Sequence, residues 1–167
     1  MQYTAIVNNP FGVLTAVVAP AILTNASSVL ALGTSNRLAR VVDRTRIVAA
    51  ELARLEPGHP DLGGWGAQLT ALQVRAHLLV RALRAFYAGL GLFAASALVS
   101  VGGSIAAYYN QKPLFELAAA AGIITGASAV SGLVFGCILM VRETQLAVHT
   151  LEEEAKTRVG NRARNPN

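Results

Sequence analysis

Three long stretches of this chain contain no charged residue. They cover residues 11–36, 85–111 and 117–141, and each is at least 25 residues long. About 20 apolar residues, at a helical rise of 1.5 Å per residue, cross the hydrocarbon core of a bilayer. Because backbone polar groups in lipid must satisfy one another, each stretch is predicted to be a transmembrane helix.

Between the first two stretches, apolar residues recur at steps of three and four in two arms of equal length, 37–56 and 65–84. This spacing predicts one apolar stripe on each of two amphipathic helices. The intervening segment 57–64 is rich in Pro and Gly and predicts a turn. Segment 37–84 is therefore predicted to be an antiparallel helical hairpin of coiled-coil type, with Leu52, Leu72 and Leu79 buried. Each arm runs straight into a charge-free stretch, so the first helix is expected to continue unbroken from its stretch into the hairpin.

Composition supports a membrane protein. The chain is 53% hydrophobic and only 14% charged, whereas a soluble domain is usually about a quarter charged. We therefore interpret residues 1–167 as one all-α integral membrane domain, with a tail at 142–167. The single cysteine, Cys137, excludes an intramolecular disulfide and a cysteine-cluster metal site.

The placement of Lys and Arg predicts the orientation. The first nine residues carry none, segment 37–84 carries eight arginines, the loop at Lys112 carries one lysine, and the chain from Arg142 onward carries five. Positive residues stay on the cytoplasmic side. The N-terminus is therefore expected outside the membrane, with the hairpin and the C-terminus in the cytoplasm.

Arginines are the candidate contacts for lipids or partners. Asp43 lies three residues from both Arg40 and Arg46, a spacing at which helical side chains can pair. We expect this surface to face head groups or to bind an anionic lipid or acidic protein partner. Nucleic acid is not expected, because acidic residues dilute the cluster and no recognition motif is present. The full candidate set is Arg37, Arg40, Asp43, Arg44, Arg46, Arg84 and Arg142.

A second candidate site is a polar layer near the membrane midplane. Asn25, Ser96 and Ser131 lie 11 or 12 residues from the arginines that close their stretches, or about 16–18 Å along a helix. Two interpretations remain open: hydrogen-bonded glue between helices, or a narrow polar path. In either case Asn25 should bond Ser96, Ser131 or a second copy of itself. The candidate layer is Asn25, Ser28, Ser96, Ser100, Ser128 and Ser131.

The third stretch carries small residues four apart. Ala118, Gly122 and Gly126 form one series, and Ser128, Gly132 and Gly136 form another. Small residues let helices approach closely in membranes. We expect two small faces, filled by the other two stretches or by another protomer.

Catalytic chemistry is not expected. No Asp, Glu, Lys, Arg or His lies within any charge-free stretch, and the three histidines are scattered. Proton relays and ion-coupled transport depend on such groups. The sequence therefore predicts neither an enzyme nor a bound cofactor or metal.

Several short elements resemble a known family. They are Asn9-Pro10-Phe11-Gly12-Val13-Leu14, then the segment 19–26, and then the segment 36–44 with its Asn-Arg-Leu-Ala-Arg and Asp-Arg elements. Together they resemble a bacterial membrane-protein family catalogued as domain of unknown function 2721. The resemblance implies the three-span layout and implies no activity.

The sequence thus favours a structural or regulatory inner-membrane protein that associates with itself. Its basic hairpin would contact a cytoplasmic partner or anionic lipid. The alternative is a small oligomeric channel that uses the polar layer.

Overall fold

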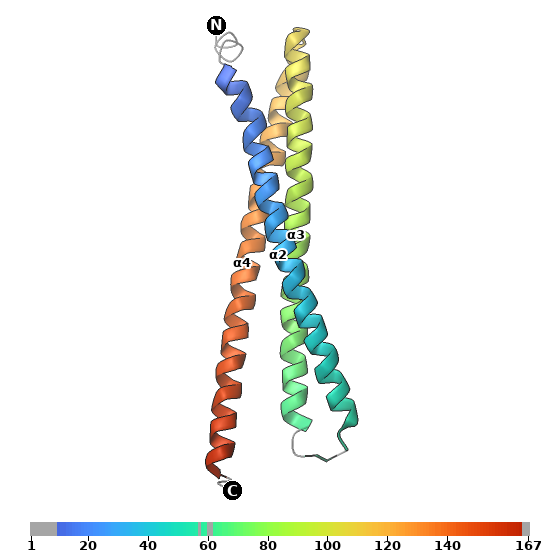
Figure 1. Ribbon diagram of the computed structural model, residues 1–167. Coiled ribbons are helices and arrows are strands. Elements are labelled where there is room, and N and C mark those ends of the chain that lie inside the picture. Colours follow the sequence, from blue (N-terminus) through green and yellow to red (C-terminus); the bar gives the residue numbers. More distant parts are fainter. Residues whose placement is uncertain (1–9, 57, 60–61, 165–167) are drawn as a thin grey trace. The chain divides into compact units, whose positions relative to one another are not determined.

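The computed structural model describes residues 10–56, 58–59 and 62–164, and its regular structure over these ranges is entirely helical (Figure 1). The helices are α2 (Pro10–Arg54), α3 (Leu62–Tyr108) and α4 (Lys112–Arg164). α2 runs without interruption from the first charge-free stretch into charged sequence, as predicted, and α3 likewise joins the second arm to the second stretch. α4 continues the third stretch to Arg164, so the predicted tail at 142–167 is helical over its described residues. The predicted outer tail, residues 1–9, and the last three residues of the chain lie outside the described residues.

The connection between α3 and α4 lies earlier in the chain than the sequence predicted, at residues 109–111 instead of 112–116. The second charge-free stretch was expected to be helical to residue 111, but α3 ends at Tyr108. Asn110 adopts a positive φ of 54°, and its N–H donates to the Ala107 carbonyl while the Gln111 N–H donates to the Ala106 carbonyl. This pair of bonds is the Schellman motif that ends many helices, and Asn tolerates the left-handed position it requires.

Contacts divide the chain into two compact units. The first unit is Met1–Gly33 with Arg84–Gly136, and the second is Thr34–Leu83 with Cys137–Asn167. Each of the three helices contributes a segment to both units. The two units are described separately below.

In the first unit, α3 and α4 pack through small residues. A Cβ placed on Gly126 would lie 3.6 Å from the Ser96 hydroxyl oxygen, and one on Gly132 would lie 3.6 Å from the Ala85 carbonyl oxygen. A Cβ on Gly136 would lie only 2.5 Å from the buried ring of Phe86. A Cβ at 3.6 Å would make an ordinary van der Waals contact, so of these three positions only Gly136 requires glycine for the close approach of the helices.

The expectation of two separate small faces on the third stretch is wrong. Gly126, from one predicted series, and Gly132 and Gly136, from the other, all contact α3. Ser128, which was grouped with the second series, is exposed. Steps of four drift around a helix with 3.6 residues per turn, so the two series merge into one seam.

The first unit exposes large apolar side chains on all three helices. Ile22 is 62% exposed, Leu98 is 74% exposed and Ile123 is 73% exposed. Among the residues that the structure describes, two helical segments are long and apolar enough to cross a membrane: Leu62–Tyr108 and Lys112–Thr150.

The second unit has an apolar core of its own. Val41 and Val48 of α2 pack with Leu72 and Leu79 of α3. Leu72 and Leu79 are buried as predicted, whereas Leu52 is only half-buried. Half-buried residues pack around this core from all three helices: Leu38, Trp65, Leu69, Ala76 and Met140.

Candidate functional site

A buried carboxylate lies beside this core. Glu143 of α4 is only 2% exposed. Its Oε1 accepts a hydrogen bond from Nε of Arg75 on α3 at 2.9 Å and lies 2.9 Å from Nη2 of the same arginine in an ion pair. A carboxylate removed from water is tolerated only when it is paired and hydrogen-bonded. Arg75 supplies both the opposite charge and a hydrogen bond to this carboxylate.

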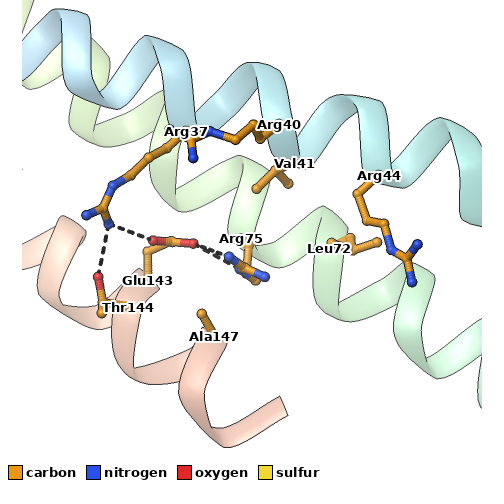
Figure 2. Close-up of a pocket in the computed structure, with 9 residues that line it drawn as sticks. All are labelled: Arg37, Arg40, Val41, Arg44, Leu72, Arg75, Glu143, Thr144 and Ala147. Carbon is orange, nitrogen blue, oxygen red and sulfur yellow. Dashed lines mark hydrogen bonds and ion pairs between the residues drawn. The ribbon is translucent and has the colours of Figure 1, made fainter. Parts of the chain in front are cut away.

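The other oxygen of the carboxylate faces an arginine from the remaining helix. Arg37 Nη1 of α2 lies 3.7 Å from Glu143 Oε2 and donates a hydrogen bond to the Thr144 hydroxyl at 3.3 Å. Figure 2 shows the two guanidinium groups at opposite ends of the carboxylate. We call Arg37, Arg75 and Glu143 the ionic node. It links three helices through one negative charge.

Helical periodicity explains why the node forms where it does. Arg75 lies between the buried residues Leu72 and Leu79, at a step of three from the first and four from the second. Glu143 follows the buried Leu139 by four residues. Residues at these steps share one face of a helix. The two charged residues therefore occupy positions that face the interior of the unit, where apolar residues would otherwise stand.

The node forms part of an open pocket of about 300 Å³. Its charged lining consists of four arginines and one glutamate, which leaves a formal excess of three positive charges. Figure 2 shows all of the lining residues. They are Arg37, Arg40, Val41, Arg44, Leu72, Arg75, Glu143, Thr144 and Ala147.

Two of the pocket arginines have no acidic partner within the described part of the chain. Arg40 donates from Nε to the Asn36 carbonyl at 3.4 Å, and Arg44 is exposed. The expected pairing of Asp43 with Arg40 or Arg46 is absent from the described residues, because Asp43 is exposed and makes no ion pair there. The arginines on this face are thus available to a ligand.

The structure divides the predicted arginine set. Arg37, Arg40 and Arg44 line the pocket. Arg46, Arg84 and Arg142 are exposed elsewhere and do not contribute to its lining.

The predicted polar layer does not assemble within one chain. Asn25 is exposed, and its side chain makes no hydrogen bond to another described residue. Its predicted partners bond backbone carbonyls instead: Ser96 donates to Gly122 across to α4 at 3.3 Å, and Ser131 donates to Ala127 on its own helix. The expected bond from Asn25 to either serine in the same chain is therefore wrong.

The other hydroxyls of the layer follow the same rule. Ser28 donates to the Thr24 carbonyl and Ser100 donates to the Ser96 carbonyl, each four residues back. A helical Ser or Thr can satisfy its hydroxyl on the preceding turn without any partner helix. Ser28 and Ser128 are exposed, so they face away from the protein interior.

Sequence reasoning missed the most buried polar groups. Glu143 was not singled out within the segment predicted to be a tail, and Arg75 was counted only among the eight arginines of segment 37–84. In the first unit, the missed Ser27 is fully buried and its hydroxyl has no partner among the described residues. The signal that could have found the node is a pair of opposite charges at apolar-stripe positions: Arg75 between Leu72 and Leu79, and Glu143 after Leu139.

The chemistry of the site is that of anion binding. Arginine presents planar N–H donors that match carboxylate and phosphate oxygens. No group of three or more His, Cys, Asp or Glu side chains that could hold a metal occurs among the described residues. The pocket therefore suits an anionic group better than a cation.

Comparison with known proteins gives one match. A family model described as a protein of unknown function (DUF2721) matches residues 17–153. No curated protein matches the chain, and no solved structure matches it. The matched range includes the whole ionic node and most of all three helices, and the chain thus belongs to the DUF2721 family.

Proposed function

We propose that this protein is a structural or regulatory protein of the bacterial inner membrane. It spans the membrane three times, associates with itself, and uses its basic cytoplasmic hairpin to bind anionic lipid or an acidic partner. The proposal gives the protein a binding role and no catalytic one.

The observation that carries the proposal is the exposure of large apolar side chains on every helix of the first unit. Ile22, Leu98 and Ile123 are each more than 60% exposed. A monomeric soluble protein rarely leaves so large an apolar surface in water, whereas lipid solvates it. Ile22 and its exposed neighbours Val29 and Leu32 support a membrane span in α2 as well.

The second unit supports the hairpin. Its core joins the C-terminal part of α2 to the N-terminal part of α3 through Val41, Val48, Leu72 and Leu79. The heptad-like steps of these residues, seven apart on each helix, support packing of coiled-coil type. Arginines cover the flank of this core at the pocket.

Self-association is supported by Asn25. Its amide is exposed in a charge-free stretch, and an unpaired amide in hydrocarbon is costly. A second copy of the chain would supply the missing partner.

Two measurements test the membrane assignment. The protein should remain in the membrane pellet after alkaline carbonate extraction. Reporter fusions after Gln111 and at Asn167 should give opposite signals, outside for the first and cytoplasmic for the second. Release by carbonate, or equal signals at both points, would remove the three-span proposal.

A further inference from the structure

We propose that the pocket beside the ionic node binds the phosphate group of a membrane phospholipid, and that Arg40 and Arg44 hold this phosphate. The inference rests on the proposed function, because a lipid ligand requires the membrane location.

Charge in the pocket selects the ligand. One carboxylate stands among four guanidinium groups, so three positive charges remain uncompensated. A phosphodiester brings one negative charge, and a terminal phosphate group brings about two at neutral pH. The pocket should therefore bind a head group with a terminal phosphate more tightly than an anionic head group whose phosphate is a diester. A zwitterionic head group, in which an ammonium compensates the diester, should bind least tightly.

The ionic node determines which arginines are free. Both donors of Arg75 that face the carboxylate are engaged at 2.9 Å, and Arg37 is shared between Glu143 and Thr144. Arg40 and Arg44 make no ion pair within the described ranges. These two side chains, one helical turn apart on α2, carry the available positive charge.

The position of the pocket along the chain indicates that the phosphate comes from a lipid. Arg37 directly follows the charge-free stretch that ends at residue 36, and Glu143 follows the stretch that ends at residue 141 by two residues. On a helix with a 1.5 Å rise, residues 37–44 lie within about 12 Å of the end of an apolar span. The head-group region is about 5–8 Å thick on each side of the hydrocarbon core. Arg37 and Arg40 fall at that depth, and Arg44 lies one helical turn farther out, from where its long side chain can reach back to a phosphate.

The size of the pocket favours a head group over a protein segment. Its volume of about 300 Å³ is at the lower end for sites that enclose small molecules. A stable protein partner would cover roughly 800 Å² of this chain, well beyond one pocket. A lipid phosphate requires only the arginines and the space between them.

The test uses the full-length protein in a neutral detergent at about 0.15 M ionic strength, where charge attraction over exposed surfaces is screened within about 8 Å. Water-soluble short-chain phosphatidic acid, phosphatidylglycerol and phosphatidylcholine are titrated separately, and thermal unfolding reports binding through the stabilisation of the folded state. Inorganic phosphate and a short polyglutamate peptide are titrated in the same way as two further candidate ligands.

The key variant is Arg40→Gln with Arg44→Gln, and the matched control is Arg46→Gln with Arg81→Gln. All four arginines are exposed, and both variants remove two positive charges, but only the first pair lines the pocket. We expect phosphatidic acid to stabilise the wild type most and phosphatidylcholine least. The pocket variant should weaken phosphatidic acid binding by at least about tenfold, since bonds to charged groups are strong, whereas the control should change it less than about threefold.

Each other outcome overturns the inference in a different way. Equal weakening by both variants would indicate diffuse attraction and would remove the pocket while keeping the basic hairpin as a lipid contact. A response to inorganic phosphate equal to that of phosphatidic acid would remove the lipid as the source. Stabilisation by polyglutamate alone would replace the lipid with an acidic protein partner. Absence of any response would remove the site, while carbonate extraction would still decide the membrane assignment separately.

Discussion

Arg75 and Glu143 are 68 positions apart in the chain, yet two nitrogens of the Arg75 guanidinium lie 2.9 Å from one oxygen of the Glu143 carboxylate. The glutamate side chain is 3% exposed and the arginine side chain is 26% exposed. The pair is therefore asymmetric: water reaches the cation and hardly reaches the anion. The carboxylate therefore needs its positive partners to offset its lost hydration, whereas the guanidinium is still partly hydrated and needs the carboxylate less.

Removal of a positive partner should destabilise the protein more than removal of the glutamate. Loss of one member of a buried pair typically costs about 3–5 kcal/mol, because the other charge is left uncompensated. We expect Arg75→Ala to approach that range, and Glu143→Gln to fall below it because Arg75 can turn toward water. Thermal unfolding in mild detergent measures both.

The double variant Arg75→Leu with Glu143→Leu tests whether stability requires the ion pair itself or only the absence of an unpaired buried charge. Well-packed apolar residues often replace a buried ion pair without loss of stability, so this variant should recover most of the stability lost in Arg75→Ala. Arg37→Gln is the control. Its contact at 3.7 Å with a half-exposed side chain should contribute no more than about 1 kcal/mol. A larger loss from Arg37→Gln than from Arg75→Ala would contradict the assigned order.

Leu79→Ala tests the core of the second unit. Leu79 is fully buried, and truncation of a buried leucine to alanine typically costs about 2–5 kcal/mol. Val74→Ala, on the same helix at a side chain that is 47% exposed, should change stability by less than about 0.5 kcal/mol. The unfolding midpoints of the two variants should differ clearly. Equal midpoints would indicate that Leu79 does not pack against protein in solution.

The helices and this core follow from local sequence patterns. The long charge-free stretches and the apolar steps through Leu72 and Leu79 depend on residues close in the chain, so they could be predicted from the sequence alone. The turn at Asn110 was missed because Asn, Gln and Tyr carry no charge and did not interrupt the apolar stretch. The three-span topology and orientation stay predictions.

The site could not be predicted in the same way. The node depends on how residues of three helices meet, and Glu143, adjacent to Arg142, has the local appearance of a solvated charge. The polar layer failed for a related reason. Equal depth along a helix does not determine direction around it, so Asn25 and Ser131 share a level with Ser96 but are exposed where Ser96 is buried.

Gly136→Ala tests the seam between α3 and α4. The added Cβ would lie 2.5–3.0 Å from three atoms of the Phe86 ring, and overpacking of this kind typically costs about 1–3 kcal/mol. Gly91→Ala is the matched control, because nothing lies within 4 Å of its Cβ position. In an open helical position the change from Gly to Ala stabilises by up to about 1 kcal/mol. The two variants should shift the unfolding midpoint in opposite directions, and a shared direction would refute the packing described for the seam.

Asn25→Leu tests self-association. A hydrogen bond between membrane helices contributes about 0.6–2 kcal/mol, so loss of the amide should raise the dissociation constant of the oligomer by about 3- to 30-fold. Sedimentation in mild detergent measures this change. Ser28→Ala, whose hydroxyl bonds Thr24 on the same helix, should leave the constant unchanged. A monomeric wild type, or an equal effect of both substitutions, would remove Asn25 from the proposed interface.

The contact between Gly136 and Phe86 also limits how this sequence can diverge. A relative with a side chain at the position of Gly136 must shrink the residue at the position of Phe86, because both cannot occupy the same volume. Such a change needs two substitutions in separate helices. A larger residue at position 136 alone would overpack the seam, and a smaller residue at position 86 alone would leave a cavity. Among related sequences, the sizes of the residues at these two positions should therefore vary together, with a larger residue at one position accompanied by a smaller residue at the other.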